Sequence, residues 1–206
     1  MDVLDSFTRS FLMLFVLLNP FLLSVYLLEL VKALTIRRFA RQLLRAGIMS
    51  FVVFASFACT GDALFRNVFQ VRFSSFLIFG GITFLIIGIR LVTSGVSAVK
   101  LGQDDEQVAV SIAMPFMIGP GTISASVLAG ARLDRLQAML AIALALAVTI
   151  AAMLALKWAH DIATQYSERL VRRYTEIAGR ATALFTGTFA IDMLLRGFEG
   201  WLATIR

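Results

Sequence analysis

Long apolar stretches alternate with short polar connections along this chain. Each stretch is continuous over roughly 20 residues, the length that a helix needs to cross the hydrocarbon core of a bilayer. The period-two alternation of membrane β-strands is not seen. The pattern predicts an all-α integral membrane protein with six transmembrane helices. The predicted spans cover residues 7–31, 43–65, 73–97, 108–131, 136–158 and 181–203.

The polar connection over residues 100–107, which contains three consecutive acidic residues, divides the chain into two halves. Each half has three predicted spans, and three is odd. The second half must therefore enter the membrane from the opposite side, so homologous halves form an inverted-topology repeat. We expect repeat one in residues 1–99 and repeat two in residues 108–206, packed together as a single membrane domain over residues 1–206.

The fourth predicted span contains a run that disfavours a continuous helix. Pro115 and Pro120 each remove a backbone donor and clash with the carbonyl four residues earlier, while Gly119 and Gly121 permit unusual backbone conformations. Non-helical backbone at membrane depth is tolerated only where it is buried in protein or lines a water-filled cavity. We therefore expect a broken helix that faces a polar solute, with a proline-kinked helix packed by its glycines as the alternative.

The first span carries a matching interruption one hundred residues earlier. Residues 19–24 align without gaps on residues 119–124, so that proline matches proline and serine matches serine. Two interrupted apolar segments at corresponding positions of two halves are the best sequence indication of a transporter site at the midplane. The predicted substrate-binding residues, at the two interruptions, are Asn19, Pro20, Ser24, Gly119, Pro120, Gly121, Thr122 and Ser124.

The polar groups at the two breaks have two interpretations. Asn19 either pairs across helices or binds solute. The hydroxyls of Ser24, Thr122 and Ser124 either satisfy backbone groups freed by the breaks or bind solute. The half-helix N-termini that follow the breaks carry partial positive charge, which suits a carboxylate group.

The third and sixth spans also show a weak correspondence, because Phe79-Gly-Gly81 resembles Phe185-Thr-Gly187 at an offset of 106 residues. In the third span, Gly80, Gly81 and Gly88 are expected to permit close helix packing, in preference to ligand contact.

The sixth span contains an acid and a base four residues apart, Asp192 and Arg196. This spacing favours pairing along one helix face. Ionisable residues inside a membrane indicate a functional site by default. The alternative is that both residues lie near the outer interface and snorkel into the headgroups.

Composition narrows the function classes. The chain has 206 residues, of which 59% are hydrophobic and 16% charged, which is outside the usual composition of soluble domains. The net charge of +6 comes from basic residues between the spans, a topology signal that argues against nucleic-acid binding. The sequence shows no nucleophile-and-base set, no metal-ligand cluster and no phosphate-binding motif. We therefore expect that the protein is not an enzyme and holds no cofactor. The single cysteine, Cys59, is expected to be a small core hydrophobe.

Lysine and arginine are enriched after the first, third and fifth spans. The clearest cluster, residues 32–45, holds five basic and no acidic residues. The positive-inside rule places these connections in the cytoplasm and both termini in the periplasm. The acidic N-terminus, with Asp2 and Asp5, is unlike a secretory signal peptide. We therefore expect the first span to be retained as a helix.

At these residues the chain resembles the MarC family of bacterial inner-membrane proteins, which is grouped with small neutral amino acid transporters. The resemblance rests on residues 18–20, 36–41, 61–71, 79–82 and 114–124. It implies six spans in two inverted repeats and transport of glycine- or alanine-sized amino acids by some members. The chain departs from the family pattern where Phe21 and Leu22 follow Asn19-Pro20 and in the charged sixth span. These departures bear on the substrate more than on the fold.

Three functional hypotheses result. The first is a secondary transporter of small neutral amino acids that works by alternating access in the lipid bilayer and is coupled to a proton or a sodium ion. The second is an exporter of other small solutes or drugs, with a larger apolar cavity lined by Phe21, Phe116 and Met117. The third is a non-transporting membrane scaffold, which predicts continuous first and fourth helices and no central cavity.

Overall fold

The structure is a computed structural model that describes residues 3–61, 63, 70, 72–94, 105–166 and 168–203. Within these residues every regular element is helical, which confirms the predicted all-α class. The predicted dividing segment over residues 100–107 lies largely outside the described residues, as do the ends of the predicted second and third spans.

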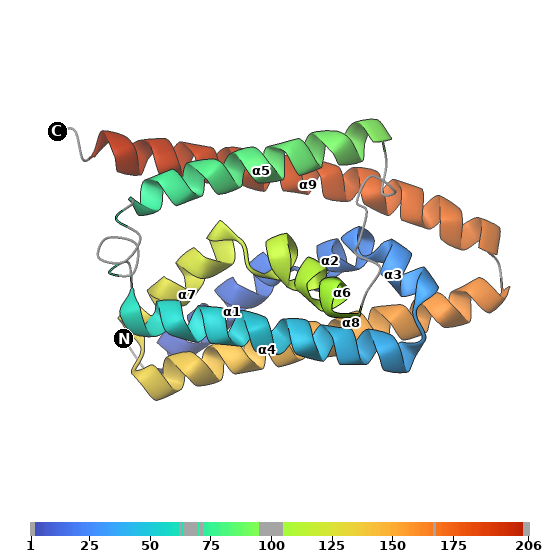
Figure 1. The fold of residues 1–206 in the computed structure, drawn as a ribbon, viewed down its shortest axis with the longest axis horizontal. Helices are drawn as coiled ribbons and strands as arrows, with labels where there is room; N and C mark the ends of the chain where they lie inside the picture. Colours follow the sequence, from blue (N-terminus) through green and yellow to red (C-terminus); the bar gives the residue numbers. More distant parts are fainter. Residues whose placement is uncertain are drawn as a thin grey trace.

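The helices run roughly along the long axis of the molecule (Figure 1). In chain order they are α1 (Val3–Leu18), α2 (Pro20–Tyr26), α3 (Leu28–Ala33), α4 (Ile36–Thr60), α5 (Phe73–Ser94), α6 (Asp105–Ile112), the π-helical turn η3 (Ala113–Met117), α7 (Pro120–Arg132), α8 (Arg135–Tyr166) and α9 (Glu168–Leu202).

Two helices begin well before the predicted spans. The second span was expected to begin at residue 43, but α4 begins at Ile36, where the Thr35 side chain accepts a hydrogen bond of 3.5 Å from the Arg38 amide. This N-cap starts the helix inside the basic segment that was expected to be a connection. Likewise, α9 begins at Glu168 instead of residue 181. Hydropathy marks only the apolar part of a helix, whereas helical hydrogen bonding continues into polar sequence.

Four helical stretches within the described residues are long and apolar enough to cross a membrane: Leu4–Ser24, Ile36–Thr60, Phe73–Arg90 and Arg135–Thr164. They correspond to the predicted first, second, third and fifth spans. The helix α7 has only 13 residues, and the described part of α9 carries Asp192, Arg196 and Glu199. The fourth and sixth crossings therefore stay predictions.

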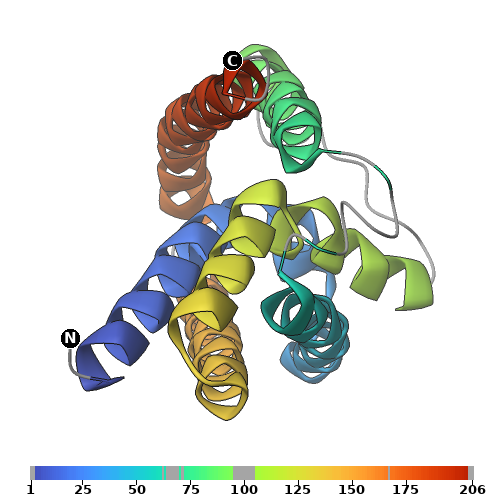
Figure 2. The ribbon, with the colours of Figure 1, turned by 90° about the vertical axis from the view of Figure 1, so that its left-hand side faces the viewer.

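The helices form two layers (Figure 2). One layer is the antiparallel pair of α5 and α9 (Figure 1). In the other layer, α8 packs against α1, α2 and α4, and α7 packs against α1 and α4. The hydrophobic core lies in this second layer, where Leu14, Phe54 and Ile142 are fully buried.

Glycines let α5 and α9 approach closely. A Cβ atom added at Gly81 would lie 2.9 Å from the backbone oxygen of Ala190, and one at Gly88 would lie 3.3 Å from the backbone nitrogen of Gly187. Small residues at such positions bring membrane helices into backbone contact. The packing roles predicted for Gly81 and Gly88 are thus confirmed.

The expected burial of Cys59 is wrong, because its side chain is exposed. The core face of α4 carries Phe54 and Phe57. Cys59 lies two residues beyond Phe57, which places it about 200° around the helix, on the opposite side.

Changing Gly130 to alanine tests how tightly α7 is held against α4. The added Cβ would lie 1.9 Å from the backbone oxygen of Ala58, a clash that only a helix shift relieves. We expect the free energy of unfolding to fall by about 1–3 kcal/mol. The matched control is Gly187→Ala, where nothing lies within 4 Å of the added Cβ. Thermal unfolding in detergent should show a lower midpoint for the Gly130 variant, and equal midpoints for the two variants would contradict the packing.

Candidate functional site

The first predicted span is interrupted at Asn19. This residue has a φ of 38°, in the left-handed region that asparagine tolerates better than most residues. Its side-chain Oδ1 accepts a hydrogen bond of 3.1 Å from the Leu22 amide and so caps α2. Backbone hydrogen bonds continue on both sides, from Asn19 to the Phe15 oxygen and from Leu23 to the Asn19 oxygen, each 3.0 Å. The interruption is therefore confined to one residue.

The fourth predicted span is interrupted more widely. Met114, which precedes Pro115, has φ −115° and ψ 131° inside the π-helical turn η3. Gly119, which precedes Pro120, has φ −118° and ψ 166°. Both residues are extended because a proline ring excludes the helical conformation from the residue before it. The predicted break is thus present, and each proline acts mainly on its preceding residue.

The side chain of Thr122 closes this second break. Its Oγ1 accepts a hydrogen bond of 2.9 Å from the Gly119 amide, and its hydroxyl can donate to the oxygen of Met117 at 2.8 Å or of Gly119 at 2.9 Å. Thr122 is buried, so these contacts satisfy backbone groups that the break would otherwise leave unpaired. The amides of Gly121 and Thr122 lie in the first turn of α7, where a helix offers no backbone acceptor.

Both breaks reach one cavity of about 440 Å³ between the two helix layers. Its walls come from α1, α2, α5, α7 and α9 and from the two interruptions. Five of the eight predicted site residues line it: Asn19, Gly119, Gly121, Thr122 and Ser124. Most of the other walls are apolar, and they include Leu17, Phe84 and Phe189.

The other three predicted site residues, Pro20, Ser24 and Pro120, are not part of the cavity wall. The Ser24 hydroxyl donates a hydrogen bond of 2.7 Å to the Phe21 oxygen within α2. Pro120 is buried against α5, where a Cβ added at Gly80 would lie 1.9 Å from the Pro120 Cγ. The absence of a side chain at Gly80 therefore lets the start of α7 reach α5.

Three polar residues of α9 complete the cavity wall: Thr186, Asp192 and Arg196. The Arg196 Nε lies 2.8 Å from the Asp192 Oδ2 in an ion pair, which confirms the pairing predicted from their spacing. Thr186 was not among the predicted site residues. Its hydroxyl lies 2.6 Å from the Tyr26 hydroxyl and joins α9 to α2. The sequence feature that could have indicated Thr186 is its alignment with Gly80 at an offset of 106 residues.

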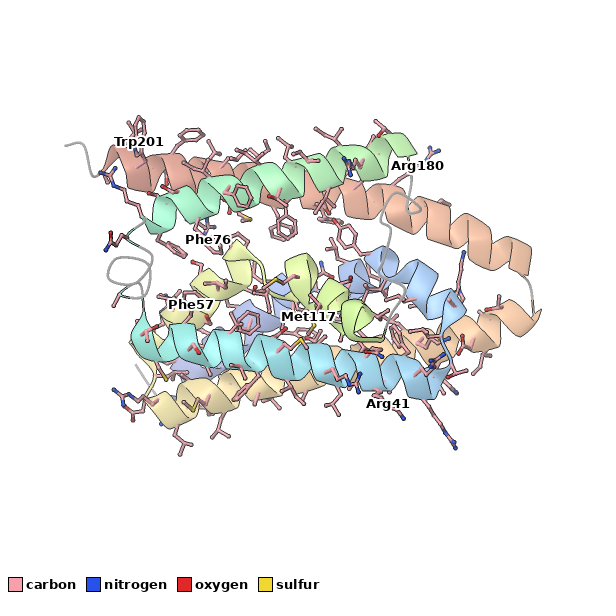
Figure 3. The ribbon with its side chains drawn as sticks, viewed as in Figure 1. Arg41, Phe57, Phe76, Met117, Arg180 and Trp201 are labelled. Atoms are coloured by element: carbon pink, nitrogen blue, oxygen red, sulfur yellow. The ribbon has the colours of Figure 1, made fainter. Side chains whose placement is uncertain are left out.

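The aromatic and methionine lining expected for a drug-sized cavity differs from the observed lining. Phe21 is exposed and lies outside the cavity wall. Met117 (labelled in Figure 3) is buried in the hydrophobic core of the second layer instead. The side chain of Phe116 lies outside the described residues.

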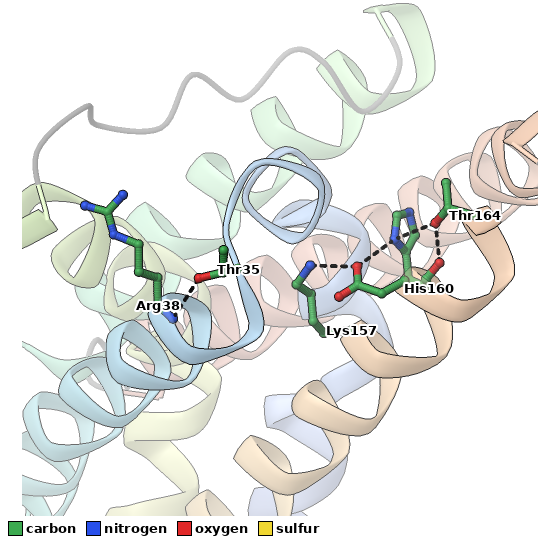
Figure 4. Close-up of polar contacts among 6 residues, drawn as sticks. Thr35, Arg38, Lys157, His160 and Thr164 are labelled. Atoms are coloured by element: carbon green, nitrogen blue, oxygen red, sulfur yellow. Dashed lines mark hydrogen bonds and ion pairs between the residues drawn. The ribbon is translucent and has the colours of Figure 1, made fainter.

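A separate polar cluster lies on the C-terminal part of α8 (Figure 4). The buried Lys157 Nζ donates to the Asp161 Oδ1 at 2.7 Å, and the His160 Nδ1 lies 3.7 Å from the same oxygen. These residues are not part of the cavity wall. The Lys157 side chain is only 3% exposed, so its ammonium group needs a partner of opposite charge. The Lys157–Asp161 pair therefore has a structural explanation.

Comparison with known proteins identifies the family. The model of the family described as "MarC family integral membrane protein" matches residues 4–202. A UPF0056 membrane protein of Pyrococcus abyssi is 26% identical over 204 residues, which cover 97% of this chain and 98% of the relative. One of Methanocaldococcus jannaschii is 26% identical over 211 residues, with the same coverage of 97% and 98%. No solved structure shows a significant match. Since the family model covers nearly the whole chain, the protein belongs to the MarC family of integral membrane proteins.

Proposed function

We propose that this MarC family protein is a multi-pass inner-membrane secondary transporter of small solutes, with small neutral amino acids of the glycine and alanine class as the favoured substrates. One observation carries the proposal. Two interrupted helices, one from each half of the chain, contribute Asn19, Gly121 and Ser124 to a single cavity. Discontinuous helices that surround a shared site are a recurrent way in which secondary transporters bind solutes.

The helix packing supports two inverted three-helix repeats. Aligning the two halves pairs α4 with α8 and α5 with α9, and each of these helices packs on its counterpart. In the same alignment α2 corresponds to α7. The contacts of α2 with α8 and α9 therefore correspond to contacts of α7 with α4 and α5, and both sets are present. Gly80 of α5 meets Pro120 of α7, while the aligned Thr186 of α9 bonds Tyr26 of α2. A pseudo-two-fold axis accounts for all these pairings.

The two-layer arrangement suggests how access would alternate. Close glycine contacts hold α5 and α9 together as one unit. This unit meets the other layer at the Gly80–Pro120 contact and at the hydrogen bond between Tyr26 and Thr186. Rocking of the α5–α9 pair about these contacts would open the cavity to one membrane face and then to the other. A proton or sodium gradient would supply the driving force.

The polar residues of the cavity wall suit a small zwitterion. The amides of Gly121 and Thr122 and the positive end of the α7 dipole would attract a carboxylate. Asn19 and Ser124 line the same cavity, and their oxygen atoms would accept hydrogen bonds from an ammonium group.

The cavity volume favours a second candidate, an exporter of larger solutes. About 440 Å³ falls in the range of roughly 300–1,000 Å³ that encloses drug-sized ligands. Competition by amino acids of increasing size and by larger apolar cations separates the two candidates, because selectivity for small amino acids should vanish in the second. The scaffold hypothesis lacks this support, since it expects continuous helices and no central cavity.

Binding of radiolabelled glycine and alanine to the purified protein tests the proposal directly. We expect saturable binding that Ser124→Ala and Asn19→Gly each weaken about tenfold, as loss of one hydrogen bond implies. Glycine at position 19 keeps the left-handed backbone accessible, so the fold is preserved. Ser56→Ala is the control, because it removes a hydroxyl from the exposed side of α4. Failure of the wild-type protein to bind any small amino acid would contradict the proposed substrate.

Gly80→Ala tests whether the start of α7 must reach α5. The added Cβ would overlap the Pro120 ring at 1.9 Å and push the Gly119–Thr122 segment away from the cavity. We expect gradient-driven uptake into proteoliposomes to fall at least tenfold, whereas Gly187→Ala leaves uptake unchanged. Normal uptake by the Gly80 variant would show that this contact does not position the site.

The exposed Cys59 is a native reporter of orientation. It lies at the end of α4 that the positive-inside rule assigns to the periplasm. A membrane-impermeant maleimide should therefore label Cys59 in intact cells. In a Cys59→Ala background, Ile36→Cys at the opposite end of α4 should react only after permeabilisation. The reverse pattern would place both termini in the cytoplasm.

A further inference from the structure

We propose that Asp192 and Arg196 form the charge-recognition subsite of the cavity. The Arg196 guanidinium binds the carboxylate of the solute, and the Asp192 carboxylate binds its ammonium group. This assignment rests on the proposed function and deepens it, because it restricts the substrates to zwitterions whose two charged groups are close together. The two breaks then shape the cavity and add uncharged hydrogen-bonding groups for the same carboxylate and ammonium, while α9 supplies the full charges that select the charge of the solute.

The level of Asp192 along the helix pair places it beside the middle of an apolar stretch instead of beside its end. Gly81 lies near the middle of the apolar stretch Phe73–Arg90, and a Cβ added there would lie 2.9 Å from the backbone oxygen of Ala190. Asp192 follows Ala190 by two residues, so it lies at the level of the middle of α5. Arg196 lies one helical turn further, about 6 Å towards the end of α9. An aspartate at such a level is costly in a membrane unless it is paired or faces water.

Both charged groups remain accessible from the cavity. Asp192 and Arg196 line it, and their side chains are 50% and 63% exposed. Among the contacts of the described residues, the pair uses the Arg196 Nε and the Asp192 Oδ2. A guanidinium has five N–H donors and a carboxylate has two oxygens. The terminal nitrogens of Arg196 and the second oxygen of Asp192 are therefore available to a ligand.

The fold itself does not require this ion pair. In the alignment of the halves, Asp192 corresponds to Ile86 of α5, which is exposed and lies outside the cavity wall. An apolar residue is thus tolerated at the equivalent position of the repeat. Because both side chains are at least half exposed, the ion pair also adds little to stability. The Asp192 carboxylate thus has no counterpart in the other half of the chain. It makes the two halves of the cavity wall different, as binding of one asymmetric solute requires.

The chain contains a matched control for the charged pair. Arg9 Nε donates to Asp5 Oδ1 at 3.0 Å, with side chains 59% and 44% exposed. This pair on α1 has the same four-residue spacing but lies outside the cavity wall. Neutralising it removes equivalent charges from a helix surface without touching the proposed subsite.

The test measures binding of radiolabelled glycine to the purified full-length protein, with glycinamide and acetate as competitors that each lack one charged group. We expect Asp192→Asn and Arg196→Gln each to lower the affinity for glycine at least tenfold. Arg196→Lys, which keeps the positive charge, should retain more affinity than Arg196→Gln. Asp5→Asn and Arg9→Gln should bind glycine like the wild type. Acetate should compete better in Asp192→Asn than in the wild type, because the repelling carboxylate is gone.

The outcomes separate this inference from the proposed function. Wild-type affinity in both neutralised variants would overturn the charged subsite and leave the amino acid transporter standing. Absence of glycine binding by the wild-type protein would overturn both. Weaker glycine binding by the neutralised variants with an unchanged competitor profile and no advantage for Arg196→Lys would indicate general damage to the site and would also overturn the subsite. Thermal unfolding midpoints close to the wild type are expected for all variants.

Discussion

The need to satisfy backbone hydrogen-bonding groups in apolar surroundings governs the centre of this protein. A proline inside a membrane helix removes one donor and drives the preceding residue out of the helical conformation. The extended backbone at Met114 and Gly119 follows from this effect. The resulting unpaired groups are costly unless a side chain or water replaces the lost partner. Thr122 supplies that partner at one break and Asn19 at the other.

The residues that repair the breaks also determine what the breaks can bind. The Thr122 hydroxyl accepts from the Gly119 amide and donates to the oxygen of Met117 or of Gly119. Its role is therefore mainly structural, even though it lines the cavity. The single-residue interruption at Asn19 leaves less free backbone than a fully unwound segment would. Side chains from outside the breaks therefore have to supply part of the recognition, and α9 contributes polar ones.

Close helix approaches divide the molecule into two parts. Gly81 and Gly88 bring α5 against α9, and Gly130 brings α7 against α4. Contacts at backbone distance resist sliding, because any displacement produces overlap. Contacts between the layers include a proline ring against Gly80 and the hydroxyl pair of Tyr26 and Thr186. A cavity between two stiff parts is the arrangement from which alternating access can arise.

The sequence by itself determined the features that depend on neighbouring residues: the helical class, the two interruptions and the pairing of Asp192 with Arg196. Proline sterics and helical spacing act within a few residues, so they can be read along the chain. The sequence also identified the family, because the match to the family model extends over nearly its whole length. The six-span inverted repeat and the identity of the solute go beyond these findings and stay predictions.

Only the tertiary structure decided which distant residues meet. Ser24 and Ser124 are equivalent in the aligned halves, yet Ser124 lines the cavity while Ser24 bonds its own helix. Cys59 lies in an apolar stretch but faces outwards, because the packing of α4 fixes which side is buried. Gly80 meets Pro120 and Asp192 reaches the cavity only because α5 and α9 pack as an antiparallel pair. Such contacts depend on how the helices are oriented against one another, which no local pattern of residues encodes.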